Sequence, residues 1–221
     1  MQSLRVDEIF DSIQGEGQDV GRLTTFVRLT GCNLRCKWCD TQHAQTGGTE
    51  IPVGEIASRC GYRVSITGGE PLLQDIGALI GAFEKAREIS VETNGTHIPP
   101  EWARKRTTGA PRVGNGVLWS VAPKFGSSGE TPDVPVLAQW CTLERVQVKF
   151  VFSGEADWEE ARALASCVPG LARHPVYLQP NGNDWQGLTR WAWERIGDWV
   201  GFDARLTPQM HVTVWGQERC K

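Results

Sequence analysis

The chain has 221 residues and a mass of 24.4 kDa, a length that fits one compact domain over residues 1–221 and leaves little room for two. Its net charge of −3 and pI of about 5.8 argue against an electrostatic nucleic-acid binder, which would carry a basic domain. No apolar stretch approaches the roughly 20 residues of a membrane span, and residues 1–10 lack the apolar core of a signal peptide. We therefore expect a cytoplasmic protein without a membrane or nucleic-acid partner.

Short β-branched runs alternate with helix-like segments along the chain. We predict strands that are nearly continuous in apolar character, as expected for burial on both faces, at residues 6–13, 25–30, 63–67, 90–93, 118–121, 146–152 and 176–179. Helices are predicted between them at residues 53–59, 72–88, 155–165 and 185–199. Residues 107–116 and 124–135 are rich in Gly, Pro, Ser and Thr, which predicts loops, either surface connections or a mobile lid.

The repeated order of strand, helix and strand predicts an α/β fold with parallel strands and right-handed crossovers. Six strands, starting at residues 25–30, are too few for a closed eight-stranded barrel. The length fits an open, curved sheet of six β/α units, a partial (β/α)6 TIM-like barrel. Residues 6–13 would precede it as an N-terminal extension, either an edge hairpin or a lid, and residues 202–206 and 211–215 would follow as an extended C-terminal tail.

Three of the seven cysteines lie within eight residues, with Cys32, Cys36 and Cys39 spaced C-x3-C-x2-C. This spacing lets three thiolates converge on one metal centre with little loop entropy to overcome. A zinc site needs a fourth ligand, which His43 could supply, whereas a four-iron cluster on three thiolates leaves one iron open for a small molecule. The other cysteines are isolated and are expected to be ordinary small buried or surface residues: Cys60, Cys141, Cys167 and Cys220.

A second motif, Gly68-Gly69-Glu70-Pro71, follows the strand predicted at residues 63–67. Paired glycines let a ligand approach the backbone closely and expose N–H groups to an anion. The cysteine loop follows the strand at residues 25–30 in the same way. Both motifs are therefore expected at the carboxyl edge of a parallel sheet, where α/β folds place their sites.

The cysteine loop and Gly-Gly-Glu-Pro together resemble the radical S-adenosylmethionine (SAM) superfamily. Further stretches are similar to the 7-carboxy-7-deazaguanine synthase family, and they span residues 10–211: FDSIQGEG at 10–17, VETNG at 91–95, Ala122-Pro123-Lys124, Gln179-Pro180 and RLTPQMH at 205–211. The resemblance implies a shortened barrel of the radical SAM type. It also implies a lyase that contracts the ring of 6-carboxy-5,6,7,8-tetrahydropterin to 7-carboxy-7-deazaguanine, with loss of ammonia, in queuosine and 7-deazapurine biosynthesis.

The resemblance also implies the cofactor sites. Cys32, Cys36 and Cys39 would hold a 4Fe–4S cluster, and the Thr41 hydroxyl would bind Mg²⁺ unless it is an ordinary loop threonine. Glu70 is expected at the SAM site, although a carboxylate there would equally suit a helix dipole. Ala122 stands where the family usually has serine, so a hydroxyl contact is lost. The implied SAM site comprises Gly68, Gly69, Glu70, Ala122, Pro123, Lys124, Gln179 and Pro180.

The implied substrate contacts lie at the end of the N-terminal segment, on the strand at residues 25–30 and beside the glycines. Arg28 sits in an apolar strand, where its fork suits the substrate carboxylate or a structural ion pair. Glu16 would accept N–H bonds from the amino-pyrimidine edge. The full set is Ile13, Gln14, Gly15, Glu16, Arg28 and Thr67, while Glu92, Asn94 and His211 fit site positions without an assigned role.

Ten tryptophans are many for this length, and four of them fall on the helix predicted at residues 185–199. One face of this helix is expected to pack on the sheet and the other to form a homodimer surface, unless all four are internal. The resemblance implies a flavodoxin or ferredoxin as reductant. The alternatives are a glycyl-radical-enzyme activating enzyme, which shares the cysteine spacing and the short barrel, and a non-catalytic iron–sulfur or zinc module.

Overall fold

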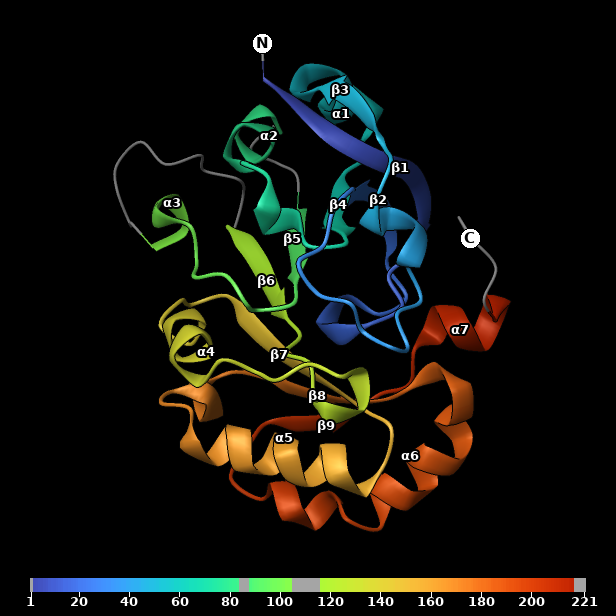
Figure 1. Cartoon of the computed structure of the whole chain (residues 1–221), viewed down its shortest axis with the longest axis vertical. Coiled ribbons are helices and arrows are strands. Elements are labelled where there is room, and N and C mark those ends of the chain that lie inside the picture. Colours follow the sequence, from blue (N-terminus) through green and yellow to red (C-terminus); the bar gives the residue numbers. More distant parts are fainter. Residues whose placement is uncertain (1, 84–87, 105–115, 217–221) are drawn as a thin grey trace.

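The computed structural model describes residues 2–83, 88–104 and 116–216. Within these ranges nine strands form one sheet in the order β3-β1-β2-β4-β5-β6-β7-β8-β9 (Figure 1). The strands are β1 (Ser3–Ile13), β2 (Leu23–Leu29), β3 (Thr49–Pro52), β4 (Arg63–Gly68), β5 (Glu88–Thr93), β6 (Val117–Val121), β7 (Val146–Phe152), β8 (Val176–Pro180) and β9 (Ala204–Leu206). The α-helices are α1 (Val53–Arg59), α2 (Gly77–Ala82), α3 (Glu101–Arg104), α4 (Val134–Trp140), α5 (Glu155–Cys167), α6 (Trp185–Trp193) and α7 (Met210–Trp215).

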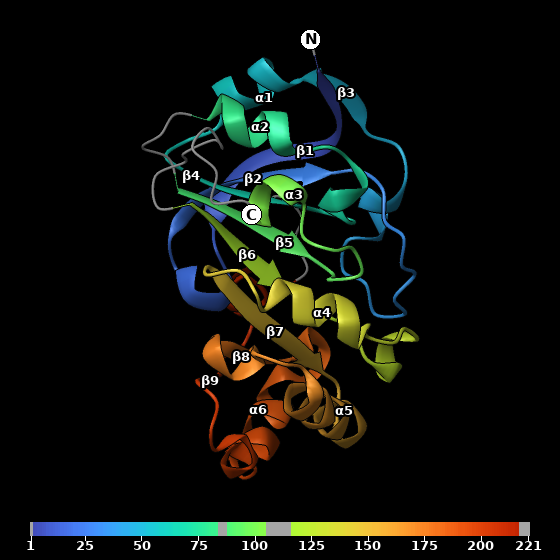
Figure 2. The same ribbon diagram turned by 90° about the vertical axis from the view of Figure 1, so that its left-hand side faces the viewer.

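The pairing confirms the α/β fold with six parallel strands, β2 and β4 to β8, and adds β9 as a seventh at the end of the row. Residues 204–206 are therefore a strand and not part of an extended tail, because they pair with β8. For residues 6–13, which were predicted to form an edge hairpin or a lid, the hairpin is confirmed, because β1 pairs antiparallel with β2. The edge position and the lid are wrong, because β3 pairs with the other side of β1. Among the described residues no pairing joins β9 back to β3, and the sheet twists progressively from β4 to β8 (Figure 2).

Strands β4 and β7 alternate apolar and polar residues over most of their length and are not nearly continuous in apolar character. The burial on both faces that was predicted with it is confirmed, since all seven residues of β7 are buried. In β4 the apolar Val64 and Ile66 alternate with Ser65 and Thr67. The register aligns residues of one kind across the sheet, since Ile66 pairs with Val91 and Ser65 with Ser90. The sheet therefore has one apolar face and one polar face, and both are largely buried.

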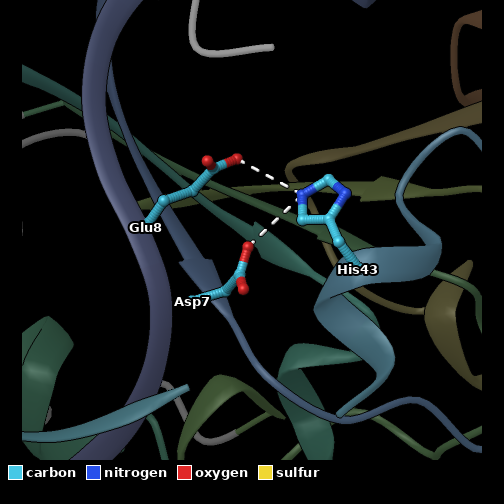
Figure 3. A group of neighbouring side chains, drawn as sticks. All are labelled: Asp7, Glu8 and His43. Atoms are coloured by element: carbon cyan, nitrogen blue, oxygen red, sulfur yellow. Dashed lines mark ion pairs between the residues drawn. The ribbon is translucent and has the colours of Figure 1, made fainter. Parts of the chain in front are cut away.

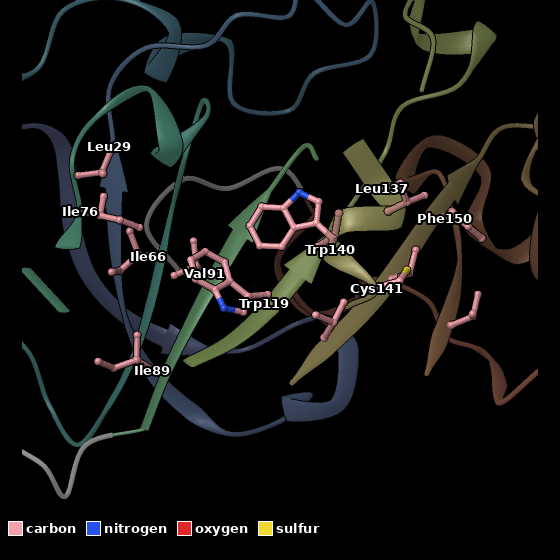
Figure 4. Packing of buried hydrophobic residues seen from close by; sticks show 14 of the residues in the cluster. Leu29, Ile66, Ile76, Ile89, Val91, Trp119, Leu137, Trp140, Cys141 and Phe150 are labelled. Carbon is pink, nitrogen blue, oxygen red and sulfur yellow. The ribbon is translucent and has the colours of Figure 1, made fainter. Parts of the chain in front are cut away.

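The apolar face carries the hydrophobic core. Ile66, Val91 and Trp119 extend from neighbouring strands, and Trp140 of α4 packs on Trp119 with 4.9 Å between ring centroids (Figure 4). Helices α1 and α2 lie beside the sheet end formed by β1 and β3, while α5 and α6 lie beside β8 and β9 (Figure 1). Because the helices cover the apolar face, the polar face is left to line a site.

Two predicted helices are interrupted. The helix predicted at residues 72–88 is a 3-10 turn, Pro71–Leu73, followed by α2, and residues 84–87 lie outside the described ranges. The break occurs at Gln74, whose extended backbone lets its side chain donate to the carbonyls of Arg5 and Thr30. The helix predicted at residues 185–199 is likewise α6 followed by a 3-10 turn, Ile196–Trp199. Long-range hydrogen bonds and packing override helical periodicity here.

Three further expectations change. Residues 211–215 were expected to be extended but belong to α7, whose first amide donates to the Gly15 carbonyl at 2.9 Å. The loop predicted at residues 124–135 contains a 3-10 turn, Gly126–Ser128, and ends in the first residues of α4. The loop predicted at residues 107–116 lies outside the described ranges except for Gly116. No helix in the described part of the chain is long and apolar enough to cross a membrane.

Candidate active site

A cavity of about 600 Å³ opens on the polar face of the sheet. Fifteen of the eighteen residues that the sequence predicted for the site line it, and the remaining three do not: Glu70, Pro123 and Pro180. Glu92, Asn94 and His211, which had no assigned role, line it as well. The tertiary structure thus brings the predicted cluster, SAM and substrate positions into one space.

The cysteine loop follows β2 and is held in place by the segment after β6. The Trp38 indole donates to the Ser127 hydroxyl at 3.0 Å, and the Lys37 amide donates to the Ser128 carbonyl at 2.9 Å. The Arg35 amide donates to the Glu130 carboxylate at 2.7 Å. These bonds fix a loop that has no regular structure of its own, so the three thiols keep their positions in the cavity wall.

The donor set suits a cluster better than a single zinc ion. Three thiolates on one zinc ion at 2.3 Å lie about 3.8 Å apart. The sulfur atoms of Cys32, Cys36 and Cys39 do not all lie within 4.8 Å of one another, and no fourth described cysteine lines the cavity. Burial raises the pKa of the Cys32 and Cys36 thiols, so iron would have to displace their protons on binding. The residues therefore fit a 4Fe–4S cluster with one iron left for another ligand.

The zinc alternative had used His43 as its fourth ligand. The His43 Nε2 atom instead lies 3.3 Å from a carboxylate oxygen of Asp7 and 3.6 Å from one of Glu8. Among the described residues no metal-ligand group combines this histidine with the cysteines. The geometry therefore gives no support to a Cys3His zinc site.

Gly68 and Gly69 let β4 pass very close to the cysteine loop. A Cβ added at Gly69 would lie 2.1 Å from the Gly31 carbonyl oxygen and 2.7 Å from the Cys32 Cβ. Gly68 has a φ of 144° and no space beside the Leu29 carbonyl. The Gly69 and Glu70 amides donate to the Leu29 and Gly31 carbonyls, which corrects the expectation that these N–H groups face an anion. The glycines instead provide a tight crossing next to the thiols.

Glu70 is fully buried behind this crossing. Its carboxylate accepts from the Leu72 amide at 3.0 Å, the Thr93 hydroxyl at 2.8 Å and the Asn94 amide at 2.7 Å. Burial raises the pKa of this carboxyl group, and the hydrogen bonds oppose that effect. Glu70 therefore caps the turn at Pro71–Leu73, as the dipole alternative implied, and ties the end of β4 to the end of β5.

A charged network also lines the cavity. The Glu16 carboxylate forms a salt bridge with Lys149 of β7, and it accepts from Gln179 at 2.9 Å and from Gln209 at 2.6 Å. Burial by itself raises the pKa of Glu16, but the charges of Lys149 and His211 and the hydrogen bonds outweigh it and lower the pKa to about 2. Glu16 is therefore an anion at neutral pH.

Gln14 and Thr67 are oriented by Glu92 of β5. The Gln14 amide donates to the Glu92 carboxylate at 3.0 Å, and the Thr67 hydroxyl donates to it at 3.1 Å. The Gln14 carbonyl oxygen accepts from the Glu16 amide at 3.1 Å. Glu92 thus acquires a role that the sequence left open: it holds two predicted substrate contacts in fixed orientations.

Arg28 points to the polar face of β2 and pairs with Glu8 of β1 at 2.7 Å. Its guanidinium also lies 5.7 Å from the centroid of the Phe10 ring. Arg28 therefore forms a structural ion pair and also lines the cavity. Both predicted roles, the ion pair and the contact with the substrate carboxylate, stay open. Thr41 lies nearby in the chain, and its hydroxyl is 3.7 Å from the Cys39 sulfur.

The Ala122 to Lys124 segment lines the cavity through its first and last residues. The Lys124 ammonium donates to the Ala122 carbonyl at 3.0 Å and lies 6.0 Å from the centroid of the Trp38 ring. Burial and the Lys149 charge lower the pKa of Lys124. Because Ala122 has no hydroxyl, Lys124 is the polar side chain that this segment offers to the site.

Sequence reasoning missed Lys149, which sits in the buried strand β7 and carries the charge opposite Glu16. The sequence did contain a signal for Lys149, because a lysine within the apolar run VQVKFVF is rarely buried unless it is paired, as holds for Arg28. Asp7 and Glu8 were also missed, since alternating charged residues in β1 look like a solvated edge. Their partners are distant in sequence and could not be read locally.

The fold and the cysteine loop together define a radical SAM protein. The family model for the radical SAM superfamily matches residues 26–106, which include the cysteine loop and the Gly-Gly-Glu-Pro motif. A radical SAM methyltransferase from Sphaerobacter thermophilus shares the fold, with a TM-score of 0.56 and 15% identity over 90% of this chain and 69% of that one.

Similarity to individual proteins shows which family of radical SAM proteins the chain resembles. A 7-carboxy-7-deazaguanine synthase of Pyrobaculum aerophilum is 33% identical over 99% of this chain and 97% of its own length. One from Methanospirillum hungatei is 32% identical over 94% of this chain and 84% of its own. The crystal structure of QueE from Escherichia coli superposes with a TM-score of 0.70 at 25% identity, covering 95% of each chain. The chain belongs to the 7-carboxy-7-deazaguanine synthase family.

Proposed function

We propose that this protein is a radical SAM lyase that converts 6-carboxy-5,6,7,8-tetrahydropterin to 7-carboxy-7-deazaguanine with loss of ammonia. The observation that carries the proposal is a single cavity that joins the three cluster thiols to Gln14, Glu16, Arg28 and Thr67. A glycyl-radical activating enzyme would need access for a protein chain and has no use for these polar contacts.

The cluster and SAM, when bound, would supply the radical chemistry, while the chain binds and orients the substrate. Arg28 would exchange Glu8 for the substrate carboxylate, which fits its fork equally well. An ionised carboxylate has about four acceptor positions, of which Glu16 uses three on Lys149, Gln179 and Gln209. The substrate's amino group would meet the remaining position.

Three finer assignments belong to the same proposal. Thr41 would give its hydroxyl to a Mg²⁺ ion that takes its other oxygen ligands from substrate and water. A flavodoxin or ferredoxin would deliver the electron.

A second copy of the chain would cover Trp193 of α6, which is 68% exposed. Sedimentation should show a dimer that Trp193→Glu converts to a monomer; a native monomer would remove this part of the proposal.

The deciding experiment is an anaerobic turnover assay with reconstituted cluster, SAM, Mg²⁺, a strong reductant and 6-carboxytetrahydropterin. We expect mass spectrometry to detect 7-carboxy-7-deazaguanine from the native protein and none from Cys36→Ala. Cys167→Ser is the matched control, because Cys167 is exposed and does not line the cavity, and it should retain both cluster and product.

Two other results would redirect the proposal. Cleavage of SAM to 5′-deoxyadenosine without a deazapurine would keep the radical SAM class and reject this substrate. No SAM cleavage by protein with a full cluster would favour a binding module, and Ala122→Ser would then test whether the lost hydroxyl is responsible.

A further inference from the structure

Three side chains of types that can ligate a metal lie close together outside the cysteine loop. Asp7 and Glu8 of β1 and His43, in the segment after the cysteines, place one ligand atom each within 4.8 Å of one another. Both carboxylates point toward the same edge of the His43 ring, at 3.3 and 3.6 Å from its Nε2 atom (Figure 3). None of the three was assigned to the cluster, to SAM or to the substrate.

A β-bulge creates this arrangement. Consecutive side chains of a regular strand point to opposite faces, so Asp7 and Glu8 could not ordinarily converge. The pairing of β1 with β2 moves from Val6–Leu29 to Glu8–Arg28, which leaves Asp7 as an extra residue. Such bulges redirect side chains and are frequent next to functional sites. Here the bulge turns both carboxylates toward the histidine.

The histidine nitrogen is a second observation that points to a ligand. His43 Nε2 is a buried atom that makes no hydrogen bond within the described structure, although two carboxylates lie within 3.6 Å. Buried polar atoms nearly always have a partner, and an exception points to a water or an ion. An ion between these groups would satisfy the nitrogen and both oxygens at once.

The spacing suits a metal ion. Nitrogen and oxygen ligands lie about 2.0–2.2 Å from a first-row divalent metal, so two of them on one ion are about 3.0–3.5 Å apart. The observed separations of 3.3 and 3.6 Å are close to this range. Glu8 also binds Arg28 at 2.7 Å, but a carboxylate has about four acceptor positions and can serve both.

We propose that Asp7, Glu8 and His43 bind a first-row divalent transition-metal cation such as Mn²⁺, Fe²⁺ or Zn²⁺. An imidazole with two carboxylates favours these metals over Mg²⁺, which prefers oxygen ligands alone. Three protein ligands leave coordination positions open, and these face the active-site cavity because Glu8 and His43 line it. The ion would tie β1 to the segment that follows Cys39. The site does not depend on the proposed reaction.

Manganese alone is a suitable probe, because free Mn²⁺ gives an EPR signal that bound Mn²⁺ loses at room temperature. The titration uses protein with its cluster loaded, so that the cysteines are occupied, and neither SAM nor substrate is added. We expect one bound Mn²⁺ per chain, with nitrogen coupling in pulsed EPR. Asp7→Asn and His43→Gln should each weaken binding at least about tenfold, and His43→Gln should abolish the nitrogen coupling.

Thr41→Val is the control, because Thr41 is the residue proposed for Mg²⁺ and is not part of this group; it should bind Mn²⁺ like the native protein. If His43→Gln does not fold, Asp7→Asn has the same shape as the native residue and carries the test alone. Equal Mn²⁺ affinity in native protein and Asp7→Asn, no binding near millimolar Mn²⁺, or bound Mn²⁺ without nitrogen coupling would each overturn the proposal. None of these readouts depends on turnover.

Discussion

Glu16 illustrates how single residues of the polar face are stabilised as ions. Its carboxylate is buried, yet Lys149, Gln179 and Gln209 surround it and keep it charged. The pair leaves neither charge without a partner, which is the condition for tolerating ions in a protein interior. The site can thus present a permanent anion to a ligand at physiological pH.

The lowered pKa of Glu16 predicts an acid-dependent stability. Its pKa falls from an ordinary 4.5 to about 2 on folding, so the stabilisation is present above pH 4.5 and is lost as the pH falls toward 2. The full effect is roughly 3–4 kcal/mol, at about 1.4 kcal/mol for each of about 2.5 pKa units. Urea unfolding of iron-free protein between pH 6 and pH 3 should show a steeper loss for the native chain than for Glu16→Gln.

The control for this measurement is Glu50→Gln, because Glu50 forms an exposed ion pair with Arg5 and exposed pairs contribute little. It should follow the native pH dependence within about 0.5 kcal/mol. Parallel curves for native protein and Glu16→Gln would show that the Lys149 pair does not hold the carboxylate ionised.

At the scale of elements, the site depends on how closely the end of β4 approaches the cysteine loop. Gly68 and Gly69 allow that approach, and Glu70 then links the end of β4 to the end of β5. Sequence motifs that seemed to contact a cofactor directly therefore divide into two groups. The glycines create space beside the thiols, whereas Glu70 holds the strand ends in place.

Gly69→Ala should disrupt the cluster more than the fold. The added methyl would lie 2.1 Å from the Gly31 carbonyl oxygen, so the loop that begins with Cys32 would have to shift. We expect iron content after reconstitution to fall below about half of the native value, measured together with the absorbance near 400 nm. Gly54→Ala is the control, because nothing lies within 4 Å of its added Cβ, and it should load iron normally. Native iron loading in Gly69→Ala would contradict this role.

At the scale of the whole molecule, an aromatic cluster joins α5, α6 and the segment after it to β7. Trp158 is buried and makes edge-on contacts with Phe152, Trp191 and Trp199 at 5.3–5.8 Å between centroids. Its indole also donates to Asp198 at 3.1 Å. Of the tryptophans assigned to the predicted helix 185–199, Trp191 and Trp199 thus pack inward, and Trp193 faces outward.

Trp158→Ala should destabilise the protein by about 3–5 kcal/mol, because it leaves a large cavity and removes three aromatic contacts. Tyr62→Ala removes an aromatic ring that is 60% exposed and should change the free energy of unfolding by less than about 1 kcal/mol. Urea unfolding of both variants checks the prediction. Similar losses for the two would mean that the aromatic cluster does not stabilise the C-terminal part of the sheet.

The sequence by itself determined the β/α order, the cysteine loop and the glycine motif, because these are local: a period of two or a spacing of three residues can be read without knowing the fold. It also placed the cysteine loop and the glycine motif at one edge of the sheet, since parallel strands bring their carboxyl ends together. The other predicted positions of the cavity wall came from the resemblance to the synthase family. It misjudged residues 72–88 and 211–215, where Gln74 and Met210 bond to distant backbone and override local preference.

Only the tertiary structure decided which ionisable groups meet. Lys149 lies 133 residues from Glu16, and Gln209 lies 193 residues from it, so no local pattern could pair them. The convergence of Asp7, Glu8 and His43 depends on one extra residue in β1, which is visible only in the register of two strands. Charge partners and bulges are long-range properties, because they arise from packing between elements rather than from the preferences of a single segment.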